Sequence, residues 1–284
     1  MSFLRQSSLR DTLLIALAAA AVVTSSAHAA TQKDSAPTDR KTGVLLKASL
    51  KYTDGSKGEV PAWSDIRVTV IRDGQQVVTD QLLPAGASVS YFQTPKLTAV
   101  DLDADDEPEV LVDVFTAERP TKRRTVVLHK QGNVYATEVS DWGTGGYRLA
   151  NVTGNKAPEF LSADSRFPAL FKSDSRGPLR VLEYSRGQVR DVSRNVRAEL
   201  LRDAKRHRRA LARARRTGDD PRAEVAAYAV DLVRLGRTAA AQAELRNAGR
   251  RRELGGSAKA FARKLDRSMV RWGYAKRRVL AGGV

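Results

Sequence analysis

Two segments, LTAVDLDADDEPEVLVDVFT at residues 97–116 and YRLANVTGNKAPEFLSADSR at residues 147–166, align without a gap at an offset of 50 residues. Glu109 of the first copy falls on Glu159 of the second. A repeat of about 50 residues that reads strand, polar loop, strand and hairpin has the size of one four-stranded propeller blade. This duplication predicts that the middle of the chain is built from antiparallel sheets.

Three hairpins are predicted by alternating apolar residues on both sides of a glycine-containing turn. They cover residues 66–83, 126–139 and 179–192. The first hairpin has no acidic loop before it and reads as the tail of an incomplete earlier copy. Two and a half units are too few to close a propeller ring. We therefore expect residues 42–192 to form a β-repeat domain of partial, propeller-like blades that stack as open sheets.

The C-terminal region, residues 193–284, changes to Ala, Leu and Arg with apolar spacing near 3.6. Capping residues, glycine and proline divide it into four expected helices, at residues 196–216, 221–235, 238–254 and 257–273. The stretch 228–248 looks like one tetratricopeptide unit, although a plain antiparallel helix pair has the same texture. The expected fold class is α+β, with an antiparallel β-repeat followed by an α-helical C-terminal region.

The N-terminus has the pattern of a secretory signal peptide: basic residues, an apolar run over 13–23 and an A-x-A motif that ends at Ala29. Residues 1–29 are the predicted signal peptide, and residues 30–41 read as a flexible leader. The alternative, an uncleaved membrane anchor, is disfavoured because the apolar run is far shorter than the roughly 20 residues that span a bilayer. The expected location is secreted or extracytoplasmic, with no transmembrane segment after cleavage.

Positive charge is concentrated in the C-terminal third. Of the formal net charge of +17, residues 191–284 hold 25 Lys and Arg against 10 Asp and Glu. One interpretation is a solvated helix surface in a protein of biased composition. The other is a basic face for an anionic cell-envelope polymer or a membrane surface. Export argues against nucleic acid as a dedicated partner, and the absence of cysteine excludes disulfides and thiolate metal sites.

The first copy of the repeat carries the candidate ion site. The loop DLDADDEPE places oxygen-bearing side chains at alternate positions over nine residues, at Asp101, Asp103, Asp105, Glu107 and Glu109. Ca²⁺ takes six to eight oxygen ligands and tolerates irregular geometry. Carboxylates at positions 1, 3, 5 and 9 with a backbone carbonyl at position 7 would wrap one ion. The alternative is an acidic turn without metal.

Over roughly residues 66–192 the chain resembles the bacterial FG-GAP and VCBS-type repeats, whose loop reads D-x-D-G-D-G-x-x-D/E. The resemblance implies that Ca²⁺ would bind the side chains of the first, third, fifth and ninth loop residues and the carbonyl of Glu107. Ala104 and Asp106 depart from the family's glycines, and Asp106 is expected to need a positive φ. The second copy, NVTGNKAPE, keeps mainly neutral oxygens and is expected to be a structural turn.

No enzyme motif stands out: there is no serine-hydrolase elbow, zinc-protease helix or phosphate-cradling loop. Trp142 and Tyr147, in a glycine-rich stretch, would form either a sugar-stacking platform or loop packing. The resemblance implies adhesion or ligand-binding modules, which also occur attached to enzymes. The leading hypothesis is a non-catalytic envelope-associated binding protein with one Ca²⁺-stabilised loop. The alternatives are a secreted hydrolase or accessory subunit with an unrecognised site, and a protein-binding scaffold that uses tetratricopeptide-like hairpins.

Overall fold

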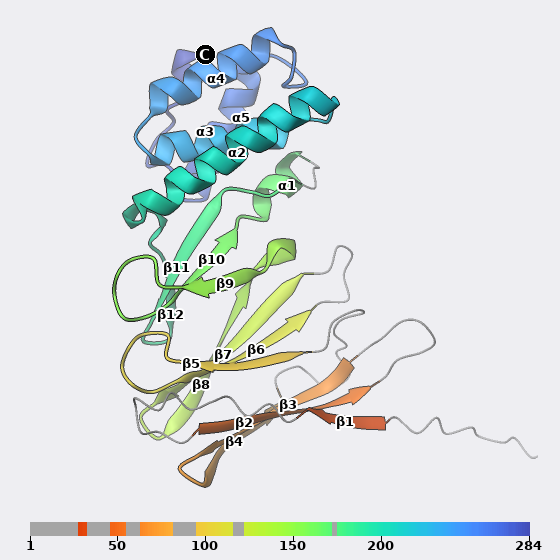
Figure 1. Cartoon of the computed structure of the whole chain (residues 1–284), viewed down its shortest axis with the longest axis vertical. Coiled ribbons are helices and arrows are strands. Elements are labelled where there is room, and N and C mark those ends of the chain that lie inside the picture. Colours follow the sequence, from red (N-terminus) through yellow and green to blue (C-terminus); the bar gives the residue numbers. More distant parts are fainter. Residues whose placement is uncertain (1–27, 33–45, 55–62, 82–94, 116–121, 172–174) are drawn as a thin grey trace, which may run out of the picture.

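The computed structural model describes residues 28–32, 46–54, 63–81, 95–115, 122–171 and 175–284. The basic start and the apolar run of the predicted signal peptide lie outside these described residues. Figure 1 shows an elongated arrangement, with sheets over the first two thirds of the chain and helices at the C-terminal end. The α+β class is confirmed, and within the described residues the sheets are open and form no closed propeller.

Within the described residues, strands in chain order form three four-stranded antiparallel sheets. The first sheet contains β1 (His28–Gln32), β2 (Leu46–Asp54), β3 (Trp63–Arg72) and β4 (Gln75–Gln81). The second contains β5 (Lys96–Val100), β6 (Glu109–Phe115), β7 (Arg123–Gln131) and β8 (Val134–Asp141). The third contains β9 (Tyr147–Ala150), β10 (Glu159–Ala163), β11 (Leu179–Ser185) and β12 (Gln188–Asp191).

The three predicted hairpins are confirmed as β3–β4, β7–β8 and β11–β12. Asp73 and Gly74 both have positive φ, at 50° and 82°, as a two-residue turn that follows the strand twist requires. Arg186 and Gly187 adopt the same pair of conformations, at 51° and 77°. The turn residues therefore set the register of the hairpins as the sequence predicts.

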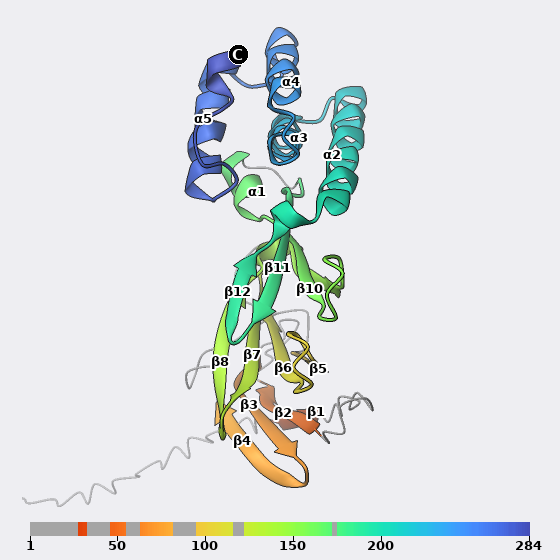
Figure 2. The ribbon, with the colours of Figure 1, turned by 90° about the vertical axis from the view of Figure 1, so that its left-hand side faces the viewer.

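The sheets stack face to face because their central strands are apolar on both sides. All seven residues of β6 are buried. Its Val110, Val112 and Val114 pack on the first sheet, whereas Leu111 packs on the third sheet through Phe160 and neighbouring residues. Burial of each such side chain contributes about 1.5–3 kcal/mol relative to exposure. The apolar cores therefore alternate with the sheets along the long axis (Figure 2).

Strand β1 pairs antiparallel with β2 and spans the predicted cleavage point, with Ala29 opposite Thr53 and Ala30 opposite Tyr52. Residues 30–32 of the predicted leader therefore lie in a strand and not in a flexible segment, whereas residues 33–41 of the leader lie outside the described residues. Backbone pairing explains the difference, since an edge strand needs no apolar pattern of its own to hydrogen bond to β2. Cleavage after Ala29 stays a prediction.

Four long helices confirm the predicted helical C-terminus. They are α2 (Arg197–Thr217), α3 (Arg222–Arg234), α4 (Thr238–Arg250) and α5 (Ala258–Arg271). Ser257 caps α5 as predicted, with its hydroxyl accepting from the amide of Ala260 at 3.1 Å. Helix α4 ends four residues earlier than predicted because Arg252 adopts a left-handed φ of 61° and the amide of Glu253 bonds to the carbonyl of Ala248.

One helix interrupts the predicted β-region. Helix α1 (Arg166–Phe171) follows β10, and its first turn is held by Asp164, whose carboxylate accepts from the amide of Arg166 at 3.0 Å. Phe167 of α1 packs into the helical core beside Trp272. The described part of the chain contains no helix with both the length and the apolar character needed to cross a membrane.

Candidate functional site

The acidic loop between β5 and β6 is a tight turn around one carboxylate. The two oxygens of Asp101 accept hydrogen bonds from the amides of Ala104 at 2.7 Å and Asp106 at 3.1 Å. Ala104 and Asp106 adopt left-handed φ values of 60° and 67°. The positive φ predicted for Asp106 is therefore confirmed, and both departures from glycine keep the backbone conformation that glycine would favour.

The turn gathers three of the predicted side-chain ligands. Carboxylate oxygens of Asp101, Asp103 and Glu109 lie within 4.8 Å of one another. Asp105 is exposed at the tip, where one of its oxygens accepts from the amide of Glu107 at 2.9 Å. Oδ1 of Asp103 is buried without a hydrogen-bond partner among the described residues. Burial of a carboxylate oxygen without a hydrogen bond costs free energy.

Glu109 is the buried member of this cluster, with 4% of its surface exposed. Burial is the largest effect on the pKa of Glu109 and raises it, the hydrogen bond from the amide of Leu102 lowers it, and the charges of Asp103 and Asp105 raise it, so that the pKa is about 8 overall. Burial likewise raises the pKa of Asp105. Without a cation, Glu109 therefore holds a proton at neutral pH. A divalent cation would take the place of that proton.

The side chain of Glu107 forms an ion pair outside the cluster of Asp101, Asp103 and Glu109. Its carboxylate accepts two hydrogen bonds from Arg72, at 2.8 and 2.7 Å, and lies 3.5 Å from Nζ of Lys130. Burial acts to raise the pKa of Glu107, but the hydrogen bonds and charges of Arg72 and Lys130 lower it overall. With the carboxylate engaged across the first and second sheets, only the carbonyl of Glu107 is left to serve as the predicted ion ligand.

The second copy of the loop repeats two hydrogen bonds of the first copy, but neutral side chains replace the aspartates predicted as ligands. The amide of Gly154 donates to Asn151 at 3.0 Å, and the amide of Val152 donates to Glu159 at 2.8 Å. In the first copy, the equivalent glutamate accepts from the amide of Leu102 at 2.7 Å. The hydroxyl of Thr153 also donates to Glu159, so a neutral donor stands where the first loop has a carboxylate.

Unpartnered polar atoms also lie below the first loop. Among the described residues, the Tyr184 hydroxyl, Nδ1 of His129 and Oε2 of Glu138 are buried without a hydrogen-bond partner. Burial raises the pKa of Tyr184, and the charges of Glu109 and Glu138 raise it further, so these three groups interact electrostatically.

The backbone amide of Arg186, in the β11–β12 turn, donates to Asp103 at 3.2 Å. The loop is therefore joined to the third sheet.

Helix α2 (Figure 1) contains more Lys and Arg residues than any other helix in the described part of the chain. A shallow hollow of about 560 Å³ runs along it, lined by Arg202, Lys205, Arg206, Arg209, Ala210, Arg213 and Arg216. Arg202 and Arg206 are neutralised by Glu199 and Asp203, respectively. The other four basic side chains are exposed and have no ion pair among the described residues. We call Lys205, Arg209, Arg213 and Arg216 the α2 face.

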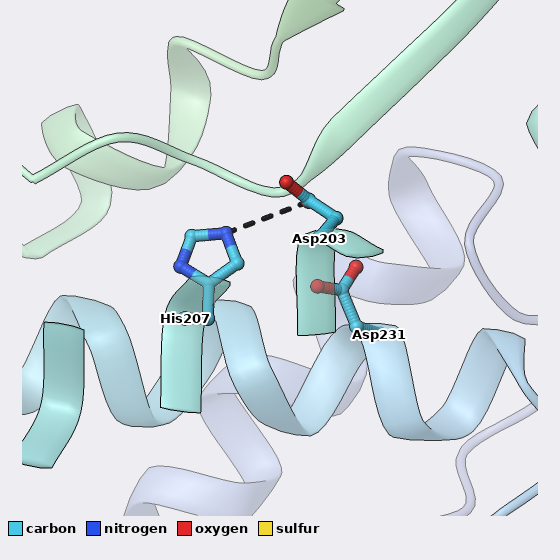
Figure 3. Close-up of side chains that lie close together, drawn as sticks. All are labelled: Asp203, His207 and Asp231. Carbon is cyan, nitrogen blue, oxygen red and sulfur yellow. Dashed lines mark ion pairs between the residues drawn. The ribbon is translucent and has the colours of Figure 1, made fainter. Parts of the chain in front are cut away.

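A buried polar cluster lies on the inner side of α2, and Figure 3 shows that its side chains converge from α2 and α3. Asp203, His207 and Asp231 bring possible metal-ligand atoms within 4.8 Å of one another. Asp203 also accepts from the amide of Leu179 at 2.7 Å, which ties α2 to β11. Nδ1 of His207 lies 2.7 Å from Glu224. Sequence analysis missed this cluster, although the Asp203 and His207 spacing of four residues places both on one helix face.

Two arginine side chains next to the Asp203, His207 and Asp231 cluster determine whether it can bind a metal ion. Nη2 of Arg206 lies 2.8 Å from Nε2 of His207, and Arg234 lies 3.8 Å from Asp231. Burial lowers the pKa of His207, but hydrogen bonds with Asp203 and the charges around it raise that pKa to about 9. Burial and the charge of Asp203 raise the pKa of Asp231. With both arginines present, a divalent cation would meet strong repulsion, so we interpret the cluster as a polar core that joins α2, α3 and β11.

Trp142 and Tyr147 pack the loop between the second and third sheets. Trp142 is 3% exposed, its ring stacks on Phe160 at 4.9 Å, and its Nε1 donates to Thr125 at 2.8 Å. Tyr147 donates to the buried Asp113 at 3.0 Å and lies under the guanidinium of Arg123. Of the two alternatives for this aromatic pair, loop packing is the one that these contacts support.

Comparison of the chain with family models, with curated proteins and with solved structures finds no match.

Proposed function

We propose that this chain is a secreted or envelope-associated, non-catalytic binding protein whose α2 face engages a linear anionic polymer of the cell envelope. The observation that carries this proposal is a row of four exposed cations, which form no ion pair with any residue that the structure describes: Lys205, Arg209, Arg213 and Arg216. The three sheets serve as a propeller-like support that holds the helices at one end of the molecule.

The spacing of the α2 face suits a polymer better than a single small anion. At 1.5 Å of rise per residue, the four cations span about 16 Å along one side of the helix, with steps of about 6 Å between Lys205, Arg209 and Arg213. Three of the four are arginines, whose planar guanidinium groups bind phosphate or carboxylate through paired hydrogen bonds. Such a row contacts several successive anionic groups of one strand.

We further propose that Ca²⁺ binds the first loop through Asp101, Asp103, Asp105 and Glu109, with the carbonyl of Glu107 as a fifth ligand. The contrast between the two loops supports this: the second loop satisfies its buried glutamate with the Thr153 hydroxyl, whereas the first opposes it with further carboxylates. All donors are oxygen atoms, which Ca²⁺ prefers. The ion would stabilise the contact between the second and third sheets and take no part in catalysis.

Binding of fluorescently labelled linear polyphosphate, followed by anisotropy over a range of salt concentrations, tests the α2 face. With about four phosphate contacts, the logarithm of the association constant should fall with the logarithm of salt concentration with a slope of about −3. Substitution of all four α2-face residues by Gln should abolish most of the affinity. The matched control removes four exposed cations from α5, at Lys259, Arg263, Arg267 and Arg271. Equal losses in both variants would show diffuse charge attraction and contradict the proposal.

Isothermal titration of Ca²⁺ into EDTA-treated protein, beside Asp103→Ala, tests the ion site. Saturable binding that disappears in the variant is the expected result. Absence of binding to the unsubstituted protein at millimolar Ca²⁺ would leave residues 101–109 as an acidic turn, and the α2-face proposal would still stand.

A hydrolase is the main alternative, and it would need converging free carboxylates near the glycine-rich stretch. Asp141 and Asp164 do lie there, but Asp141 accepts from the amide of Gly143 at 2.8 Å and Asp164 is engaged by Arg166 and Tyr274. The protein-binding scaffold would use the α3–α4 pair. The hollow on the adjacent helix is lined by arginine and lysine, which favours an anionic partner over an apolar peptide.

A further inference from the structure

A separate cleft lies where the third sheet meets α1, with a volume of about 1150 Å³. It is bordered by the glycine-rich stretch before β9, by β9 and β10, and by residues 175–177 before β11. Its volume slightly exceeds the range of about 300–1,000 Å³ that is common for small-molecule sites. The cleft and the α2 face have no lining residue in common, so the inference drawn here does not depend on the proposed function.

The walls of the cleft are preformed by close backbone packing. Gly143 has a φ of 60°, and a Cβ at this position would lie 2.3 Å from the Ser165 side chain. A Cβ on Gly177 would lie 2.0 Å from the carbonyl oxygen of Asp164. Leu161 and Ala163 add a small apolar floor. A rigid site of this kind orders few groups when a ligand binds, which favours affinity.

The acidic groups in the wall are already neutralised. Asp164 is buried and accepts two hydrogen bonds from the guanidinium of Arg166, which in turn lies over the ring of Trp272. Asp141 lies 3.6 Å from Arg124. Neither carboxylate is therefore available to balance another cation in the cleft.

Two guanidinium groups in the cleft have no direct partner within the described part of the chain. Arg148, on β9, and Arg176, before β11, both line the cleft and have no hydrogen bond or ion pair among the described residues. Loss of solvent around the guanidinium and the charge of Arg206 lower the pKa of Arg176, the charge of Asp203 raises it in part, and the charge of Arg148 lowers it further. The residue as a whole remains exposed. Two positive charges thus line one preformed hollow, and an oxyanion bound there would reduce their mutual repulsion.

We propose that this cleft binds a ligand that carries phosphate or carboxylate groups on a sugar-sized body, with Arg148 and Arg176 as the anion contacts. The planar forks of two arginines match the paired oxygens of either group. The hydroxyl groups of Thr144 and Ser165 in the wall offer neutral hydrogen bonds to ligand hydroxyls. The cleft volume accommodates more than a free phosphate ion, which is why the anionic group is assigned to a larger body.

Calorimetric titration with two probes, tripolyphosphate and tetragalacturonate, tests this site on the full chain in which the four α2-face residues are replaced by Gln, so that the α2 face does not contribute to probe binding. We expect at least one probe to bind with one-to-one stoichiometry and the double variant Arg148→Gln/Arg176→Gln to weaken it by at least about tenfold, as expected for loss of charge-assisted hydrogen bonds. Binding of tripolyphosphate alone assigns a phosphate ligand, and binding of tetragalacturonate alone assigns a uronate ligand. Because both side chains are exposed and unpaired, the double variant should fold, which circular dichroism checks.

Two controls separate the cleft from general charge. Arg263→Gln/Arg267→Gln removes the same charge from exposed positions of α5 and should leave probe affinity within about twofold. The fourfold α2-face background keeps the probes off the α2 face, so failure of the α2-face proposal remains distinguishable. Equal weakening by the cleft and α5 double variants, unchanged affinity in the cleft variant, or no binding of either probe would overturn the inference.

Discussion

Replacement of Glu109 by Gln should stabilise the protein in EDTA and abolish its response to Ca²⁺. The substitution keeps an oxygen that accepts the hydrogen bond from the amide of Leu102 and removes the charge that the acidic loop repels. In the unsubstituted protein, the pKa of Glu109 is raised from 4.5 to about 8, so folding without metal at neutral pH requires uptake of a proton. The Gln side chain needs no proton.

The magnitude follows from the pKa difference. Each unit corresponds to about 1.4 kcal/mol, so the cost of proton uptake grows from about 1 kcal/mol at pH 5 to about 3 kcal/mol at pH 7 and about 4 kcal/mol at pH 8. The sign is fixed because a group with a raised folded-state pKa contributes most below its unfolded pKa, and that contribution is lost as pH rises towards about 8. Glu109→Gln should lack this loss.

Urea unfolding in EDTA between about pH 5 and pH 8, followed by tryptophan fluorescence, measures the difference. Glu159→Gln is the matched control, because Glu159 occupies the same position in the second loop and accepts from neutral donors. Addition of Ca²⁺ at 100 times its dissociation constant should stabilise the unsubstituted protein by about 2.7 kcal/mol and leave Glu109→Gln unchanged. If Glu109→Gln is destabilising in EDTA, or if its effect does not vary with pH, the assigned protonation of Glu109 is wrong.

Three further predictions concern stability. Between about pH 6.5 and pH 9 the helical region should lose stability as His207, whose pKa is raised to about 9, loses its proton, and His207→Gln should remove that pH dependence in thermal melts. Ala104→Gly should raise the melting temperature by the equivalent of about 1 kcal/mol, because it relieves a left-handed φ of 60°, and an unchanged or lower value would contradict this. Asp113→Ala should cost about 3–5 kcal/mol in urea unfolding, since it leaves the guanidinium of Arg123 without its buried carboxylate, and a loss below about 1 kcal/mol would count against this ion pair.

The parts of the fold that local chemistry determines were predictable from the sequence. Asp73 and Gly74 require a two-residue hairpin turn, and Ser257 and Gly273 bound the last helix. The 50-residue offset between Glu109 and Glu159 indicated equivalent turns, which the matching hydrogen bonds from Leu102 and Val152 display.

Other features depend on contacts that no local pattern carries. The buried cluster of His207 needs Glu224, 17 residues later, and the amide of Leu179 from another element bonds to Asp203. The cleft at Arg148 and Arg176 forms only because the third sheet and α1 meet. The exposure of a basic residue likewise depends on which face of its helix packs inward. The number of Lys and Arg residues in the sequence therefore indicated a basic C-terminal region but not which side of α2 carries the exposed charges.

The stacking order of the sheets has a consequence for cooperativity. One apolar core joins the first sheet to the second, another joins the second to the third, and a third joins that sheet to the start of α2. Within the described residues no such core links the first sheet directly to the third or to the helices. The free energy of folding then behaves as a one-dimensional sum of units and nearest-neighbour interfaces. Heating should therefore unfold the chain in steps that start at its less stable end. The contact between the second and third sheets, which the acidic loop supports, determines whether the unfolding of one sheet spreads to the next.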